Sequence, residues 1–276
     1  MKYVYSRQRR GDFRSMDGRI QKGLVSVIIP TYNASLFVRE AIDSVLLQTY
    51  HSFEVIVVDD ESNDGVSEVM KIYGDRVRYY EKKHEGVSSA RNFGVVHSHG
   101  EFIAFLDADD IWNKHKLEKQ VPFFSDESIG LVYADMEFFG EPFRFRFFSE
   151  MAGGMWGGRV AQQLLRGNFI GTSSIVIRRT LFEEVGGFPL RVAIGEDYRT
   201  WLKVALRSKI QPAREPLVRY RMHGSQASKD RRKSYEALID MYASLLRDQD
   251  FVAYRPLIFA KYVEYCLKFF VTKLLF

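Results

Sequence analysis

Stretches of mostly apolar residues alternate with stretches of helical apolar spacing through the first 120 residues of the chain. Short apolar runs bounded by proline or polar residues are typical of strands. Apolar residues three and four positions apart are typical of helices. A regular alternation of the two predicts a mainly parallel sheet flanked by helices. The predicted strands are residues 24–29, 53–58, 77–81 and 101–106, and the predicted helices lie within 38–46, 67–73 and 86–96.

The pattern after residue 121 is less regular. Aromatic residues on both sides of Gly140-Glu141-Pro142 predict an antiparallel pair of strands within 138–148. Residues 217–222 predict a further strand, and Gly195-Glu196-Asp197 precedes apolar residues at helical spacing. The second half is therefore predicted to contain a small antiparallel section.

The two ends of the chain differ from its centre. Residues 1–23 are basic and polar, which predicts a flexible, solvated leader in preference to one that contacts acidic lipid headgroups. Residues 24–225 form the predicted folded domain. Residues 226–276 form a helical extension with aromatic and apolar faces at 235–246 and 255–276. Aromatic stripes at helical spacing favour packing on the domain over a place in a membrane interface.

Composition limits the classes of protein that the chain can belong to. A hydrophobic content of 46% and an aromatic content of 14% predict a sizeable core over 276 residues. The net charge of +5 and the pI of about 9.1 fit attraction to anionic substrates or to an anionic membrane surface. The basic residues are spread out and no nucleic-acid-binding motif occurs, so a nucleic-acid partner is not predicted.

Cysteine usage and hydropathy indicate a cytoplasmic protein. Cys266 is the single cysteine, which excludes a disulfide framework. The first 23 residues lack the apolar core of a signal peptide, and no apolar run approaches the roughly 20 residues needed to span a bilayer. Localisation at the inner face of a membrane remains compatible with these features.

Three acidic residues, Asp107, Asp109 and Asp110, directly follow the strand predicted at 101–106. Closely spaced carboxylates repel one another, and a divalent cation such as Mg²⁺ or Mn²⁺ is the simplest partner for them. Two other interpretations stay open. Asp110 can cap a helix over 112–120, and the first Asp of such a motif is the nucleophile in aspartyl-phosphate phosphatases.

Strands that run in parallel bring the residues after them to one edge of the sheet. Tyr32, Asp60 and the acids at 107–109 are then expected together. This set matches a nucleotide, with an aromatic face for the base, an acceptor for a base N–H and a metal for the diphosphate. Neither G-x-G-x-x-G nor a Walker A loop occurs.

Acids at the start of a helix have two interpretations. Glu196 and Asp197 are favoured there by the helix dipole, which needs no catalytic role. They can equally act in acid–base chemistry. His223 follows a predicted strand, where a lone histidine is more often a loop residue than a ligand.

Six motifs occur in the same order as in a known family. The chain resembles family 2 of the inverting glycosyltransferases, which have the GT-A fold, over about residues 24–225. The resemblance implies a Rossmann-like, mainly parallel sheet, with a nucleotide-binding half at 24–120 and an acceptor half at 121–225. The motifs are VSVIIPTYN at 25–33, AIDSVLLQTY at 41–50, FEVIVVDDES at 53–62, GVSSARNFG at 86–94, EFIAFLDADDIW at 101–112 and GEDYRTW at 195–201.

The resemblance implies donor-binding roles for five residues. Pro30 and Tyr32 would line the nucleotide base, with Tyr32 stacked on it. Asp60 would accept a base N–H, in this family commonly from the uracil of a UDP-sugar. Arg91 would lie near the nucleotide and its diphosphate, and Asp107 would meet the ribose or the donor sugar.

The resemblance also implies the residues of the chemical step. Asp109 would bind Mn²⁺ or Mg²⁺, and His223 would complete the metal shell. Asp197 would be the general base, already ionised at neutral pH if its pKa is ordinary, with Glu196 beside it in the acceptor site. Gly153–Gly158 and Gly224–Lys233 are candidate lids.

The function expected from this resemblance is transfer of a sugar from a nucleotide-sugar to a saccharide or lipid-linked acceptor, in bacterial surface polysaccharide synthesis. Inverting transfer is one in-line displacement, which needs leaving-group stabilisation, a base and held substrates. Two alternatives are a non-catalytic subunit that binds a nucleotide-sugar or a partner enzyme, and a phosphatase with Asp107 as its nucleophile.

Overall fold

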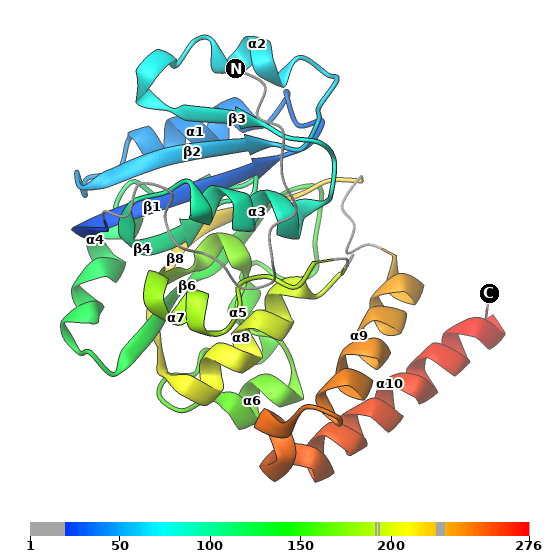
Figure 1. Cartoon of the computed structure of the whole chain (residues 1–276). Coiled ribbons are helices and arrows are strands. Elements are labelled where there is room, and N and C mark those ends of the chain that lie inside the picture. Colours follow the sequence, from blue (N-terminus) through cyan, green and yellow to red (C-terminus); the bar gives the residue numbers. More distant parts are fainter. Residues whose placement is uncertain (1–19, 191, 193, 225–229, 276) are drawn as a thin grey trace.

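The computed structural model describes residues 20–190, 192, 194–224 and 230–275. Its centre is an eight-stranded sheet of order β3-β2-β1-β4-β7-β6-β8-β5 (Figure 1). The first four strands are parallel, as the alternation of strand and helix predicts. They are β1 (Gln21–Thr31), β2 (Phe53–Asp59), β3 (Arg78–Glu81) and β4 (Gly100–Phe105).

The second half of the chain extends the sheet. β7 (Val176–Arg178) pairs antiparallel with both β4 and β6 (Ile129–Gly140). β6 then pairs in parallel with β8 (Lys209–Met222), and β5 (Ile111–Trp112) closes the edge antiparallel to β8. The predicted mixed α/β class with a small antiparallel section is confirmed.

Two local predictions are wrong. Residues 138–148 do not form an antiparallel pair of strands, because β6 takes 129–140 and pairs with β8; only Glu137 and Phe147 form an isolated antiparallel bridge. Trp112 does not begin a helix, because it belongs to β5 and the helix begins at Lys116. The first strand also begins three residues earlier than predicted, at Gln21. The rest of the predicted leader, residues 1–19, lies outside the described residues.

Helices cover both faces of the sheet. Alternate residues of β1 and β4 point to opposite faces, so Val27 and Ala104 pack with α1 and α4, whereas Ile28 and Ile103 pack with α3, α6 and α8. The helices are α1 (Val38–Leu46), α2 (Val66–Met70), α3 (Val87–Val96), α4 (Lys116–Gln120), α5 (Phe148–Ala152), α6 (Ala161–Arg166), α7 (Arg179–Glu184) and α8 (Glu196–Arg207).

The C-terminal extension is a pair of helices, α9 (Arg231–Leu245) and α10 (Arg255–Leu275), joined by the 3₁₀ turn η5 (Gln249–Tyr254). They run side by side at one end of the molecule (Figure 1). Tyr242, Phe251 and Ile258 are fully buried in the same core as Trp201 of α8. One face of this extension therefore packs on the domain. Within the described part of the chain, no helix combines the length and the apolarity that crossing a membrane requires.

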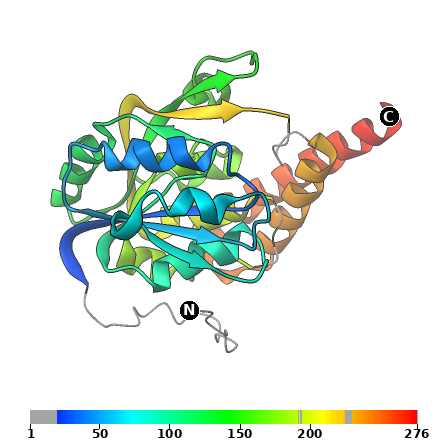
Figure 2. The ribbon, with the colours of Figure 1, turned by 90° about the horizontal axis from the view of Figure 1, so that it is seen from above.

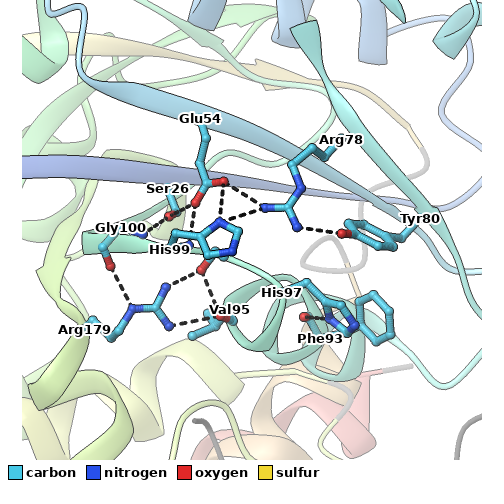
Figure 3. A network of polar contacts seen from close by, with 11 residues as sticks. Ser26, Glu54, Arg78, Tyr80, Phe93, Val95, His97, His99, Gly100 and Arg179 are labelled. Atoms are coloured by element: carbon cyan, nitrogen blue, oxygen red, sulfur yellow. Dashed lines mark hydrogen bonds and ion pairs between the residues drawn. The ribbon is translucent and has the colours of Figure 1, made fainter. Parts of the chain in front are cut away.

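A polar network holds the strands together at the amino edge of the sheet (Figure 3). The carboxylate of Glu54 accepts hydrogen bonds from the Ser26 hydroxyl at 2.7 Å, the His99 backbone N–H at 2.6 Å and the Arg78 guanidinium at 2.9 Å. Burial acts to raise the pKa of Glu54, but these donors hold it below its ordinary value. The network therefore joins β1, β2, β3 and the residue before β4 through one ionised carboxylate.

A buried arginine joins the two halves of the chain at the same edge (Figure 3). Arg179, the first residue of α7, donates to the backbone carbonyls of Gly100 at 2.7 Å and Val95 at 3.0 Å, and to the Ser98 hydroxyl. Because backbone acceptors satisfy this buried charge, α7 is fixed against the turn between α3 and β4. The amino edge is thus rigidly built, and it lies opposite the strand ends that carry the predicted site.

Candidate functional site

A cavity of about 710 Å³ lies at the carboxyl edge of the sheet. This is where open α/β sheets bind ligands, because the loops that follow the strands meet there. Every predicted site residue except Asp60 lines it. They come from the ends of β1, β4 and β8, from α3 and from the start of α8: Pro30, Tyr32, Arg91, Asp107, Asp109, Glu196, Asp197 and His223.

Arg91 is the buried centre of the site. Its side chain is 4% exposed, and its Nη1 and Nη2 donate to Glu196 Oε1 at 2.7 Å and Asp107 Oδ1 at 2.6 Å. The guanidinium also lies over the Phe188 ring, 5.2 Å from its centroid. Burial opposes the charge, but the two carboxylates outweigh it and raise the pKa of Arg91. One cation therefore holds an acid from the first half of the chain beside an acid from the second half.

Asp109 and His223 meet at the side of the cavity formed by β4 and β8. Asp109 Oδ2 lies 2.8 Å from His223 Nε2. Burial and the nearby Asp107 carboxylate raise the pKa of Asp109, whereas the contact with His223 lowers it. A carboxylate that is destabilised by burial and by a like charge gains from a cation at the same place.

The donor set fits a metal that takes most of its ligands from a substrate. In the described ranges no group of three or more His, Cys, Asp or Glu side chains is arranged to hold a metal ion. Asp109 and His223 would provide two ligands at most, and Mg²⁺ is usually held by one or two carboxylates together with substrate phosphates and water. A divalent cation bound jointly with a diphosphate is compatible with this site, whereas a cage made of protein ligands alone is not.

Asp110 has a different role from the helix cap considered above. It is 1% exposed, and it accepts hydrogen bonds from the Ser173 hydroxyl at 2.6 Å and the Arg221 backbone N–H at 3.0 Å. The same Ser173 hydroxyl accepts the Asp107 backbone N–H at 3.1 Å. Asp110 therefore fixes the acidic turn between the 3₁₀ turn η3 (Thr172–Ser174) and β8.

Asp197 is the second residue of α8 and is partly buried at the cavity wall. Its Oδ2 accepts a hydrogen bond from the Thr172 hydroxyl at 3.0 Å. Burial first, and then the charge of Glu196, raise the pKa of Asp197 to about 7, although Arg91 acts to lower it. Asp197 therefore does not have the ordinary pKa on which the expectation of full ionisation at neutral pH depended. A group that titrates near neutrality is well suited to accept a proton.

Thr172 is a site residue to which the sequence alone assigned no role. The sequence feature that contains Thr172 is a polar run, Gly171-Thr172-Ser173-Ser174, between apolar segments. Such a run is typical of any turn. Thr172 and Ser173 bond acids from two different elements, Asp197 and Asp110. That use depends on tertiary contacts that the local pattern does not encode.

The predicted base-binding residues Tyr32 and Asp60 differ in exposure, and His84 contacts both of them. Tyr32 is 51% exposed at the cavity rim and stacks on His84 with ring centroids 4.3 Å apart. Asp60 is 2% exposed and does not line the cavity. Its carboxylate accepts from Lys82 Nζ at 2.7 Å and from the Gly86 backbone N–H at 2.7 Å. Contact of Asp60 with a base remains a prediction, and the sequence analysis did not single out His84, which stacks on Tyr32.

The two predicted lids have different outcomes. The segment Gly153–Gly158 does not line the cavity. Gly158 exchanges two backbone hydrogen bonds with Ile210 of β8, at 2.8 and 3.0 Å, and the backbone N–H of Trp156 donates to the Tyr133 hydroxyl at 2.8 Å. These bonds fix the segment against the sheet, which does not suit a lid. Half of the other predicted lid, residues 225–229, lies outside the described residues.

Comparison with known proteins identifies the family. The model of glycosyl transferase family 2 matches residues 26–186, more than half of the chain. The chain belongs to the family 2 glycosyl transferases. The matched segment runs from within β1 through β4, the acidic turn and η3, and it ends before the acids of α8.

Relatives of this family 2 glycosyl transferase differ in length. It is 30% identical to the Escherichia coli UDP-Glc:alpha-D-GlcNAc-diphosphoundecaprenol beta-1,3-glucosyltransferase WfgD over 82% of this chain and 87% of that protein. It is 31% identical to an uncharacterised glycosyltransferase of Rickettsia bellii over 84% of this chain. The match spans only 34% of that relative's length.

Solved structures share the fold at lower identity. Staphylococcus aureus TarS residues 1–349 in complex with UDP-GlcNAc superposes with a TM-score of 0.69 at 20% identity, covering 89% of this chain and 73% of that one. The Pyrobaculum calidifontis mannosyltransferase PcManGT in complex with GDP-Man and Mn²⁺ has a TM-score of 0.64 at 22% identity, covering 86% and 68%. These likenesses establish the fold of this family 2 glycosyl transferase.

Proposed function

We propose that the chain is an inverting glycosyltransferase that moves a sugar from a UDP-sugar to a saccharide or lipid-linked acceptor in bacterial surface polysaccharide synthesis. One observation carries the proposal. A single cavity is lined by the Asp107–Asp109 turn, suited to a metal and a diphosphate, and by Asp197, suited to accept a proton. Both are needed for a one-step displacement, and Arg91 ties the two sides together.

The donor is inferred from the rim and from related proteins. Pro30 and Tyr32 line the cavity after β1, where an aromatic ring can stack on a base. WfgD is named for a UDP-glucose donor, and TarS was solved with UDP-GlcNAc. UDP-sugars are therefore the first donors to test, with Asp60 as the proposed acceptor of a base N–H.

Asp109 and His223 would hold Mn²⁺ or Mg²⁺ beside the donor's diphosphate. When bound, the metal supplies Lewis-acid stabilisation of the charge that develops on the leaving diphosphate. Asp107, held by Arg91, borders the same space and would meet the ribose or the donor sugar. The buried guanidinium adds positive charge behind this turn, which also favours an anionic ligand.

Asp197 would accept the proton of the attacking acceptor hydroxyl. The bond that forms joins the acceptor oxygen to the anomeric carbon, and the bond that breaks joins that carbon to the diphosphate oxygen. The hydroxyl proton passes to a carboxylate oxygen of Asp197, and the electron pair leaves with the diphosphate. Thr172 and Glu196 would orient the base and the acceptor.

The raised pKa of Asp197 predicts a pH-dependent rate. Only the ionised carboxylate accepts a proton, so kcat should rise about tenfold per pH unit below the pKa and level off above it. With a pKa of about 7, the rise is expected mainly between about pH 5 and 7. A pH profile of kcat at saturating donor and metal measures this, and a profile that is flat from about pH 5 to 8 contradicts the assignment.

A screen of donor hydrolysis tests the function. The chain is incubated with Mn²⁺ and a panel of UDP- and GDP-sugars, and slow release of nucleoside diphosphate is followed. Turnover of at least one UDP-sugar is expected. Chelation of the metal or Asp109→Asn should lower it at least about tenfold, because a major source of leaving-group stabilisation is lost.

Asp75→Asn is the matched control, because Asp75 is exposed and remote from the cavity. UDP binding without turnover of any donor would instead favour a non-catalytic binding subunit. A phosphorylated Asp107 would favour the phosphatase alternative. Turnover that neither chelation nor Asp109→Asn reduces contradicts the metal site.

A further inference from the structure

Three buried side chains support the short turn η3, which carries Thr172 and Ser173. They are Trp112 of β5 and Lys116 and Gln120 of α4, and all three are buried. Lys116 and Gln120 are four residues apart, so both lie on one face of α4. None of the three lines the cavity. Together these three residues form a support layer behind the site.

The support layer donates hydrogen bonds to three consecutive backbone carbonyls, two in η3 and one directly after it. Trp112 Nε1 donates to the Ser173 carbonyl at 2.8 Å, Gln120 Nε2 to the Ser174 carbonyl at 2.8 Å, and Lys116 Nζ to the Ile175 carbonyl at 3.3 Å. A 3₁₀ turn of three residues is held weakly by its own hydrogen bonds, because their geometry is poorer than in an α-helix. The position of η3 therefore depends on these external donors.

The hydroxyls of η3 hold acids from both halves of the site. Thr172 donates to Asp197 of α8 at 3.0 Å. Ser173 donates to Asp110 at 2.6 Å and accepts the Asp107 backbone N–H at 3.1 Å. The same turn is thus bonded through its carbonyls to the support layer and through its hydroxyls to the acids. A shift of η3 would move Asp197 and the acidic turn relative to each other.

Lys116 is an unusual residue for a buried position. Its Nζ lies over the Trp112 ring, 3.9 Å from the centroid, and burial lowers the pKa of its amine well below the ordinary value. Lysines are rarely buried, because burial disfavours their charge. An apolar side chain would fill the same volume at lower cost, but it could not donate to the Ile175 carbonyl. The contact with the end of η3 is therefore what a lysine adds here.

We infer that Trp112, Lys116 and Gln120 are positioning residues for glycosyl transfer, because they hold η3 where it aligns Asp197 with the acidic turn. They act through Thr172 and Ser173 and do not border the space for the substrates. The inference rests on the proposed function, since it takes Asp197 as the general base. Weakening the support layer should change the chemical step and leave donor binding nearly unchanged.

The variants Lys116→Met and Trp112→Phe test this inference in the full chain. Each removes one donor to η3 and keeps most of the buried volume. Calorimetry should find the affinity for UDP within about threefold of wild type, because neither change touches the proposed donor-binding residues. If Lys116→Met does not fold, Trp112→Phe decides the question, since it loses only one N–H and keeps an aromatic ring under the amine.

The pH profile of kcat is the decisive measurement. The hydrogen bond from Thr172 acts to lower the pKa of Asp197, so weakening it should move the midpoint of the profile upward. Glu196 and Arg91, the charged groups that act on Asp197, are the same in both variants. We expect a rise of at least about 0.5 pH unit, which makes kcat at least about threefold lower on the acidic side of the midpoint.

Hydrogen exchange gives a second readout that does not depend on activity. The backbone N–H groups of Ser174 and Ile175 donate within η3, to the carbonyls of Gly171 and Thr172. Their exchange should be faster in both variants than in wild type, because a turn without its external donors opens more often. Unchanged exchange in both folded variants overturns the inference even if no donor is turned over.

Arg179→Met is the matched control for Lys116→Met. Arg179 is also a buried cation that donates to backbone carbonyls, but it lies at the opposite, amino edge of the sheet. Its loss should lower stability without moving the midpoint of the pH profile. Thr172→Val is the reference, because it removes the hydroxyl itself and should raise the midpoint at least as far as either support-layer variant.

These comparisons separate the inference from the proposed function. A midpoint that rises in Thr172→Val but not in folded Lys116→Met or Trp112→Phe overturns the inference and leaves the proposed function intact. An equal rise in Arg179→Met also overturns it, because general destabilisation would then explain the effect. A midpoint that does not move even in Thr172→Val contradicts Asp197 as the base, and the inference fails together with that assignment.

Discussion

Asp197→Asn is expected to reduce kcat by about 10²–10⁴-fold, which is the usual contribution of a general base. The amide has nearly the same shape, and its carbonyl can still accept the hydrogen bond that Thr172 donates to Asp197. UDP affinity should therefore stay within about threefold of wild type, because the change does not touch the residues proposed to bind the donor. Steady-state kinetics with a saccharide acceptor, and calorimetry with UDP, measure the two quantities.

The stability of Asp197→Asn distinguishes lost chemistry from misfolding. The folded state raises the pKa of Asp197 to about 7. Ionising this carboxyl therefore costs folding free energy progressively as pH rises above its unfolded-state value toward about 7. The neutral amide avoids that cost, so the variant should be at least as stable as wild type at pH 8. Asp75→Asn, at an exposed position, should change neither rate nor stability. If the Asp197→Asn variant keeps more than about a tenth of wild-type kcat, Asp197 is not the general base.

Arg91→Met is expected to lower the free energy of unfolding by about 3–5 kcal/mol, the usual cost of removing one partner from a buried ion pair. Methionine fills a similar volume and can still pack on Phe188, but it leaves Asp107 and Glu196 without their shared cation. Both carboxylates would then repel each other in a partly buried site. Urea denaturation monitored by circular dichroism measures the loss.

Arg166→Met is the matched control for Arg91→Met, because Arg166 ends α6 on the surface. It should change stability by less than about 0.5 kcal/mol. Carboxylates protonate in acid, so the difference between Arg91→Met and wild type should shrink as pH falls. A loss below about 1 kcal/mol at pH 8 would indicate that water already satisfies the two carboxylates.

The parallel half of the fold was predictable from local pattern. Each apolar run from β1 to β4 is separated by a helical stretch, and such an alternation leaves few topologies. The order of motifs was equally informative, because it linked Asp107, Asp109 and Asp197 across 90 residues of chain. The structure then places all three around one cavity.

The second half was not predictable in the same way. β6 and β8 pair in parallel although 68 residues separate Gly140 from Lys209, and their register shifts twice around Asp135. No local sequence pattern indicates that β6 pairs with β8. The aromatic residues after Gly140 suggested a hairpin, but tertiary pairing with β8 outweighs that local preference.

The ionisation of the site's acids and their hydrogen-bond partners also could not be predicted from the sequence. The pKa of Asp197 depends on burial and on Glu196 and Arg91, and the role of Asp110 depends on Ser173 and Arg221. These contacts join residues up to 111 positions apart. Residue type suggested which groups are chemically capable, whereas their ionisation follows from the packing around them.

Strand β8 ends beside the cavity, and eight residues after His223 the helix α9 begins. Eight residues reach at most about 29 Å even when fully extended. In Figure 2, β8 (yellow) points toward the side where α9 and α10 lie. Tyr242 of α9 is also buried in the same core as Trp201 of α8, so packing, and not this connection alone, sets where the extension lies relative to the cavity.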